Sequence, residues 1–175
     1  MIVHADGLFC DNKNKNLWIY TADCMPILFA DKYQRRIAAI HCGRKGLEKN
    51  IISNAIKIFE TIGSSKKDIL VSIGPSISAD NYLLDKKTFY KFFCAIDRSF
   101  SKVNKNLNIF NNLNDYEPTP LDIKKYAYLQ LLMENLDPNN IDISDECTYS
   151  LPNEFHSWRR SKNNKRQWSV ICSSI

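Results

Sequence analysis

The sequence predicts a mixed α+β fold in a single domain that spans residues 1–175, and three observations lead to this prediction. The chain has 175 residues, which is the length of one domain and is enough to bury a core. Apolar residues make up 44% and charged residues 25% of the sequence, which are globular proportions. Several strand-like runs occur for each helical segment, so the pattern lacks the strict alternation of a parallel α/β fold.

Three strands and a helix are expected in the first third of the chain. Aromatic and branched residues gather in residues 17–20, 25–30 and 36–40, which are therefore predicted strands. Apolar residues then recur at helical spacing from Leu47 to Ile62, and this spacing predicts a helix that Gly63 ends.

The remainder of the chain mixes short strands with two further helices. Residues 69–73 form a predicted strand that Gly74 and Pro75 stop. Residues 99–120 are rich in Asn and Lys, and we expect them to be the least ordered stretch. Helices are predicted over residues 86–96 and 121–136, and strands over residues 141–143 and 168–172.

The composition excludes several classes of protein. Mean hydropathy is -0.35, and no apolar run approaches the ~20 residues that a membrane helix needs. The first residues, MIVHAD, show no basic segment before an apolar one, so no signal peptide is expected. The six cysteines show no CxxC pair. We therefore interpret them as reduced thiols and expect a cytoplasmic location.

The net charge of +5 is mild, but five basic residues gather near the C-terminus, between Arg159 and Arg166. A basic cluster can bind nucleic acid or phosphate, whereas a solvated loop is the simpler explanation. On charge alone the loop is favoured, and nucleic acid is the least favoured partner.

Two chemically active side chains stand at the ends of predicted strands, Cys24 and His41. Thiolate and neutral imidazole are preferred zinc ligands, and a catalytic zinc uses three protein ligands and one water. A cysteine nucleophile with a histidine base is the alternative, and Asp23 would orient or polarise either arrangement. From spacing alone a core cysteine and a strand-end histidine would be the stronger interpretation.

A second group mixes aromatic residues with arginines near the C-terminus, over residues 155–160 (FHSWRR). Arg159 and Arg160 are candidate phosphate ligands because a guanidinium pairs with phosphate bidentately and stacks on rings. The alternative is an arginine-rich loop packed on its own Trp158. The sequence holds neither GxGxxG nor GxxxxGK[ST], so a nucleoside-triphosphate site is not supported.

Several separate motifs, in order along the whole chain, resemble the laccase-domain (YfiH-like) family. Residues 21–26 (TADCMP) are nearly its TADCLP motif, and residues 38–46 (AAIHCGRKG) are similar to AAAHAGWRG. Further similarities are ADGLF at residues 5–9, IGPSIS at 73–78, LDI at 121–123, CT at 147–148 and FHSWRR at 155–160.

The resemblance implies mixed β-sheets in an α/β/β/α arrangement and a zinc ion, or copper in older accounts, held by two histidines and one cysteine. Cys24 and His41 match two of these ligands. It implies phosphorolysis of adenosine, inosine and methylthioadenosine, with adenosine deamination alongside. Some members are instead described as peptidoglycan editing factors that remove L-Ser from a muramyl precursor, and polyphenol oxidase is the older label.

The chain also departs from the family pattern. Members carry a further N-terminal portion with the first metal-binding histidine, so this chain is expected to be N-terminally shortened, and His4 is not at that position. Arg44 and Lys45 stand where Trp and Arg are usual, and residues 79–83 (ADNYL) replace the family's PCCYE. The third metal ligand is therefore unidentified.

The leading hypothesis is a zinc-dependent purine nucleoside phosphorylase with adenosine deaminase activity. Its expected partners are a purine nucleoside and phosphate, and we expect a cytoplasmic monomer without membrane contact. The alternatives are a peptidoglycan-editing amidase, a copper polyphenol oxidase and an inactive remnant with an incomplete metal site. In the predicted site Cys24 and His41 are the metal ligands. The catalytic residues are Cys24, His41 and Asp23. The substrate or phosphate ligands are Arg44, Arg159 and Arg160.

Overall fold

A five-stranded sheet forms the centre of the computed structural model, which describes residues 5–100 and 118–173. Neighbouring strands are antiparallel except β5 and β8, which run parallel. The strand order is β1 (Gly7–Cys10), β4 (Ile37–Cys42), β3 (Met25–Asp31), β5 (Ile69–Ile73) and β8 (Ile141–Ile143). Strands β3 and β4 are buried along almost their whole length, since both faces of the sheet are covered.

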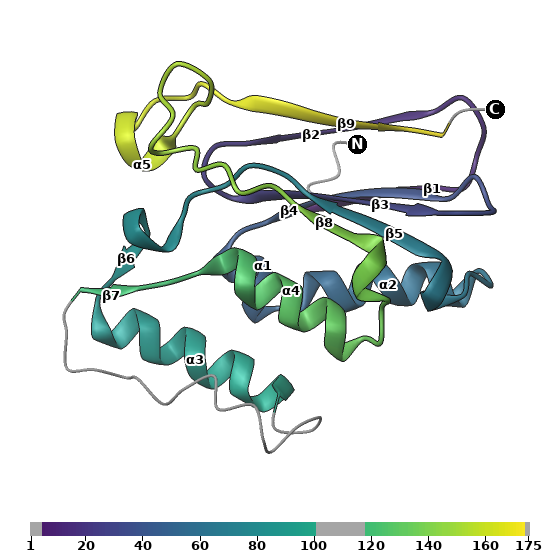
Figure 1. The fold of residues 1–175 in the computed structure, drawn as a ribbon, viewed down its shortest axis with the longest axis horizontal. Helices are drawn as coiled ribbons and strands as arrows, with labels where there is room; N and C mark the ends of the chain where they lie inside the picture. Colours follow the sequence, from purple (N-terminus) through teal and green to yellow (C-terminus); the bar gives the residue numbers. More distant parts are fainter. Residues whose placement is uncertain (1–4, 101–117, 174–175) are drawn as a thin grey trace.

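Helices cover one face of this sheet, as Figure 1 shows. They are α1 (Arg44–Glu48), α2 (Ile51–Thr61) and α4 (Ile123–Met133), while α3 (Lys86–Phe100) packs on α1, farther from the sheet. The core lies between these layers and includes Phe29, Phe59, Ile52 and Leu131, none of which exposes any surface. Each helix is held by burial of its apolar face, worth about 1.5–3 kcal/mol for a fully buried large side chain.

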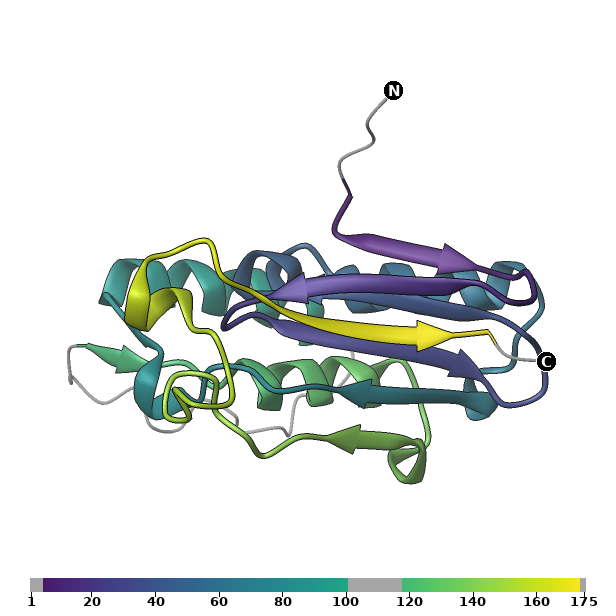
Figure 2. The ribbon, with the colours of Figure 1, turned by 90° about the horizontal axis from the view of Figure 1, so that it is seen from above.

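A two-stranded ribbon covers the other face of the sheet. Strands β2 (Asn16–Thr21) and β9 (Gln167–Cys172) pair antiparallel and lie over β3 and β4 (Figure 2). Side chains alternate along β2, so that Ile19 and Thr21 are buried against the sheet while Trp18 and Tyr20 face outward. The expected α+β class with mixed sheets is confirmed, and the described residues stack as helices, sheet and ribbon.

Short elements connect these layers. A small two-stranded antiparallel sheet of β6 (Leu83–Leu84) and β7 (Thr119–Pro120) lies beside α3, and α5 (Trp158–Ser161) is a single turn near one end of the ribbon (Figure 1). The three 3-10 turns are η1 (Lys66–Asp68), η2 (Ala79–Asn81) and η3 (Pro138–Asn140).

The expectation of one helix between Leu47 and Ile62 was wrong, because the segment forms two helices. Asn50 separates α1 from α2 and has a φ of 56°. Asn tolerates this left-handed conformation, which ends a helix. The buried Gln130 amide braces the break by donating to the Leu47 carbonyl at 3.0 Å.

Other expected boundaries differ less. Helix α4 begins at Ile123 because the Asp122 carboxylate accepts a hydrogen bond from the Lys125 N–H at 3.0 Å, which caps the helix. The small sheet of β6 and β7 was not predicted, since two-residue strands carry no periodicity. Most of the stretch 99–120 lies outside the described residues. Within residues 5–100 and 118–173, no helix has the length and apolarity to cross a bilayer.

Candidate functional site

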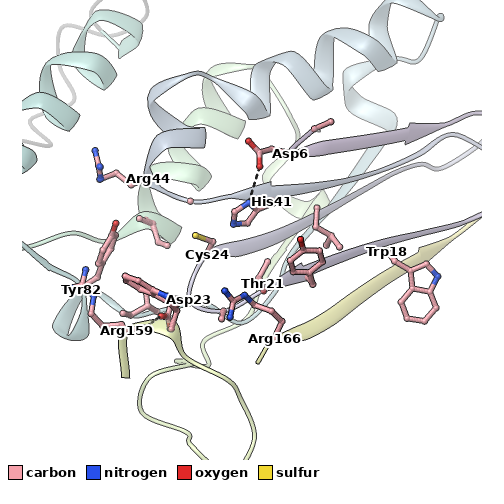
Figure 3. Close-up of a pocket in the computed structure, with 18 of the residues that line it drawn as sticks. Asp6, Trp18, Thr21, Asp23, Cys24, His41, Arg44, Tyr82, Arg159 and Arg166 are labelled. Carbon is pink, nitrogen blue, oxygen red and sulfur yellow. Dashed lines mark hydrogen bonds and ion pairs between the residues drawn. The ribbon is translucent and has the colours of Figure 1, made fainter. Parts of the chain in front are cut away.

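A cavity of about 730 Å³ is bordered by β2 of the ribbon, the turn between β2 and β3, the end of β4 with the start of α1, and the segment around α5, and we refer to it as the trough. It runs along β2 and past the turn between β2 and β3 (Figure 3). The residues of its wall that carry the argument below are Asp6, Trp18, Tyr20, Thr21, Asp23, Cys24, His41, Arg44, Tyr82, Arg159 and Arg166.

Cys24 borders the middle of the trough, in the turn that leads into β3. Its sulfur lies against Gly43, where an added Cβ would be 2.5 Å from Sγ, so only glycine fits at position 43. Burial, followed by the negative charges of Asp23 and Asp6, raises the pKa of the Cys24 thiol to about 11. Without a metal this cysteine is therefore protonated at neutral pH, which argues against a thiolate nucleophile.

His41 lies beside Cys24, near the end of β4, and is oriented by Asp6 (Figure 3). Its Nδ1 is 3.3 Å from Asp6 Oδ1, and its backbone N–H donates to the Asp6 carbonyl at 2.7 Å. In the tautomer that carries the proton on Nδ1, His41 donates to Asp6, which leaves Nε2 as the nitrogen available to the trough. A carboxylate on one ring nitrogen is the usual partner of a metal-binding histidine.

The described residues supply two metal donors, not three. Cys24 Sγ and His41 Nε2 suit zinc chemically, and Asp6 supports His41. No group of three or more His, Cys, Asp or Glu side chains that could hold a metal ion occurs in residues 5–100 and 118–173. His4 lies outside the described residues. A zinc ion therefore fits the two donors only if a further donor comes from elsewhere.

Asp23 lies beside Cys24 but has a structural role. Its carboxylate is buried and accepts hydrogen bonds from Thr148 Oγ1 at 2.8 Å and from the Arg159 N–H at 2.6 Å. Its φ of 84° is unusual for a residue other than glycine, so these two bonds hold a strained turn. Asp23 thus joins the β2–β3 turn to the C-terminal segment and fixes Arg159 at the trough.

Two of the three predicted arginine ligands border the trough together. Arg44 opens α1 and forms an ion pair with Glu48. The guanidinium of Arg159 lies 5.0 Å from the ring centroid of Tyr82, which Arg44 also contacts. Their charges make this end of the trough positive, which suits an anion.

Arg160 is placed differently. Its guanidinium donates to the carbonyls of Thr148, Tyr149 and Phe155 at 2.6–2.7 Å, which ties the C-terminal loop together. Arg166, which the sequence indicated only as a member of a basic cluster, lines the trough instead.

Sequence reasoning missed Asp6, Thr21 and the aromatic residues Trp18, Tyr20 and Tyr82. The alternation in residues 16–21 (NLWIYT) predicts that Trp18 and Tyr20 share a face. No sequence pattern indicates a role for Asp6, because its contact with His41 depends on the pairing of β1 with β4.

Comparisons with known proteins identify the family. A family model described as multi-copper polyphenol oxidoreductase laccase matches residues 2–174. The chain belongs to this laccase-domain family.

Curated relatives in this family are named purine nucleoside phosphorylases. The protein slr1573 of Synechocystis sp. is 32% identical over 97% of this chain and 68% of its own length. YlmD of Bacillus subtilis is 32% identical over 90% of this chain and 54% of its own length. The laccase-domain chain therefore spans between about half and two thirds of the curated relatives that it matches.

Solved structures show the same fold. YlmD from Geobacillus stearothermophilus superposes with a TM-score of 0.82 and 25% identity, covering 98% of this chain and 62% of that chain. The hypothetical protein YfiH of Bacillus licheniformis gives a TM-score of 0.75 and 27% identity, covering 94% of this chain and 60% of that chain.

The role of Asp23 predicts the effect of Asp23→Asn. An asparagine keeps one acceptor oxygen but turns an N–H₂ group toward a donor, so we expect the free energy of unfolding to fall by about 2 kcal/mol. Urea denaturation measures the loss, with Asp142→Asn on the exposed part of β8 as the matched control. Equal stability of the two variants would contradict the structural role.

Thiol reactivity tests the electrostatics of the site. Burial acts to raise the pKa of Cys147, but hydrogen bonds from Ser78 and Ser150 outweigh it and lower that pKa to about 6. At pH 7 Cys147 is then mostly thiolate, whereas Cys24, with a pKa of about 11, is protonated.

In chelator-treated protein we therefore expect iodoacetamide to label Cys147 faster than Cys24 at pH 7. Raising the pH to 9 should accelerate Cys147 little, because it is already ionised. Peptide mass mapping measures both rates, and urea-unfolded protein, in which the two rates should converge, is the control. Labelling of Cys24 first in the folded protein would contradict this account.

Proposed function

We propose that this laccase-domain protein is a purine nucleoside phosphorylase that acts on adenosine, inosine and methylthioadenosine. The names of the curated relatives support the reaction class. Since the chain covers only part of those relatives, the proposal rests as much on the trough itself.

The order of groups along the trough carries the proposal. Arg44 and Arg159 lie on one side of Cys24 and His41, and Trp18 lies on the other (Figure 3). Tyr20, which is on the same face of β2 as Trp18, also lines the trough. Phosphorolysis needs this order, because phosphate attacks the sugar carbon from the side opposite the departing base. A phosphate on the arginines and a base on the aromatic side would place the sugar beside Cys24 and His41.

The chain's residues contribute mainly by binding and orientation. A phosphate oxygen bonds to C1′ of the ribose, the bond between C1′ and the base nitrogen breaks, and its electron pair leaves with the base, which takes up a proton. The products are ribose 1-phosphate and the free base. Arg44 and Arg159 would hold phosphate through charge-assisted hydrogen bonds and orient its attacking oxygen.

Zinc is part of the proposal. Cys24 Sγ and His41 Nε2 would hold it with a donor from outside the described residues. When bound it would supply Lewis-acid chemistry to an oxygen in the trough. Adenosine deamination is proposed as an accompanying activity of the same site, in which water replaces the amino group and releases ammonia.

The direct test is product analysis of adenosine incubated with zinc-loaded protein, with and without phosphate. We expect adenine and ribose 1-phosphate only when phosphate is present, and inosine if deamination occurs. Cys24→Ala should remove turnover and lower the bound zinc, because one of two donors is lost. If the folded protein forms neither of these products, the proposal is contradicted. A muramyl-L-Ser precursor or a phenol would then be the next substrate to test.

A second prediction concerns the arginine end. Arg159→Gln removes charge-assisted hydrogen bonds, so we expect the KM for phosphate to rise about 10- to 100-fold while the KM for adenosine changes little. The matched control is Arg35→Gln, an exposed arginine in the turn between β3 and β4. Steady-state kinetics with each substrate varied in turn decides the matter, and an equal effect on both KM values would refute the assignment.

A further inference from the structure

Tyr82 lies where the two arginines at the arginine end of the trough come together. The guanidinium of Arg159 lies 5.0 Å from the centroid of its ring, and the guanidinium of Arg44 contacts its hydroxyl group (Figure 3). The three residues come from separate elements, since Arg44 opens α1, Arg159 is in α5 and Tyr82 follows η2. One aromatic side chain thus contacts two cations that are far apart in the sequence.

The backbone of Tyr82 is fixed on both sides. Its N–H donates to the Ala79 carbonyl at 3.0 Å, and its own carbonyl accepts from the Leu121 N–H at 3.0 Å. Leu121 is fully buried, and the Tyr82 ring packs against the same core. Burial raises the pKa of the Tyr82 phenol more than Arg44 lowers it, so the side chain is neutral at neutral pH. Tyr82 is therefore a neutral ring whose position the fold determines.

The guanidinium of Arg159 keeps most of its hydrogen-bond donors available. Its one hydrogen bond to the described residues is the long contact of Nη1 with the Leu83 carbonyl, at 3.4 Å. A guanidinium has five N–H donors in one plane, and stacking on a ring occupies its face and not this edge. Arg160 shows the contrast, because its guanidinium donates to three backbone carbonyls. Arg159 therefore retains donors for a molecule in the trough, whereas Arg160 holds the loop together.

The charges at this end are only partly balanced. Two guanidinium groups that contact one side chain repel each other, so their placement needs compensating groups. Glu48 forms an ion pair with Arg44, and the Tyr82 ring presents its electron-rich face to Arg159. Within residues 5–100 and 118–173, no ion pair joins Arg159 to an acidic side chain. An anion in the trough would supply the negative charge that Arg159 lacks.

We propose that Tyr82 is the positioning residue for the two arginines that bind phosphate. Its ring holds the guanidinium of Arg159 and its hydroxyl holds that of Arg44, so that both present N–H donors to one anion. Tyr82 acts through the arginines and not on the reacting bond. This inference rests on the proposed function and adds the residue that determines how tightly phosphate is bound.

The test measures the binding of inorganic phosphate by titration calorimetry, without any nucleoside. Tyr82→Leu removes the ring and the hydroxyl, so we expect the Kd for phosphate to rise about tenfold. Tyr82→Phe keeps the ring against Arg159 and loses only the contact with Arg44, so the Kd should rise about threefold. The KM for adenosine should stay within about twofold of its original value in both variants, because the arginines do not hold the base. An unchanged Kd for phosphate in either variant would overturn the inference.

A double-mutant cycle separates positioning from simple packing. In the Arg159→Gln background the ring has no cation to hold, so Tyr82→Leu should raise the Kd for phosphate only as much as Tyr82→Phe does, about threefold. A further tenfold rise in this background would show that Tyr82 and Arg159 act independently, which would overturn the positioning role.

Tyr33→Leu is the matched control. Tyr33 lies in the turn between β3 and β4, exposes 76% of its surface and does not line the trough. The substitution removes the same atoms as Tyr82→Leu and should leave the Kd for phosphate unchanged. A tenfold loss in this variant as well would overturn the specific role of Tyr82.

The same measurements separate this inference from the proposed function. Binding of phosphate that weakens in both Tyr82 variants, without any phosphorolysis, would support the positioning role and contradict the reaction. Phosphorolysis with a phosphate affinity that neither variant alters would support the reaction and overturn the positioning role. Absence of phosphate binding to the unaltered protein would overturn the positioning role directly.

Discussion

The buried carboxylate of Asp23 is the constraint on which the candidate site depends. Its two oxygens accept hydrogen bonds from Thr148 and Arg159, two residues far away in the sequence. These bonds hold a left-handed residue in the short turn between the ribbon and the sheet. Because Cys24 follows Asp23 directly and Arg159 is bonded to it, one interaction positions a thiol and a guanidinium at the same trough.

The two ends of the trough therefore differ in chemical character. Arg44 and Arg159 lie on one side of Cys24 and His41, and the exposed ring of Trp18 lies on the other, with Arg166 beside Thr21. A site with this polarity favours a substrate that is anionic at one end and flat and apolar at the other, with the reacting bond between them. Phosphate, ribose and purine meet this description in the order that phosphorolysis requires.

The resemblance of their segments to the family indicated Cys24, His41 and Arg159, which spacing alone would not have singled out, and the structure places all three at the trough. The resemblance could not separate Arg159 from its neighbour Arg160, since the difference lies in which backbone carbonyls the folded loop presents. The contact of Asp6 with His41 depends on the pairing of β1 with β4, which no local pattern indicates. The break at Asn50 was missed because apolar periodicity continues across it, whereas one left-handed residue decides the backbone path.

The most direct measurement of the central claim is a crystal structure of the protein with adenine and ribose 1-phosphate bound together. The account predicts the phosphate between Arg44 and Arg159, the ribose beside Cys24 and His41, and the adenine against Tyr20 and Trp18. Adenine at the arginine end, or both products bound outside the trough, would contradict it.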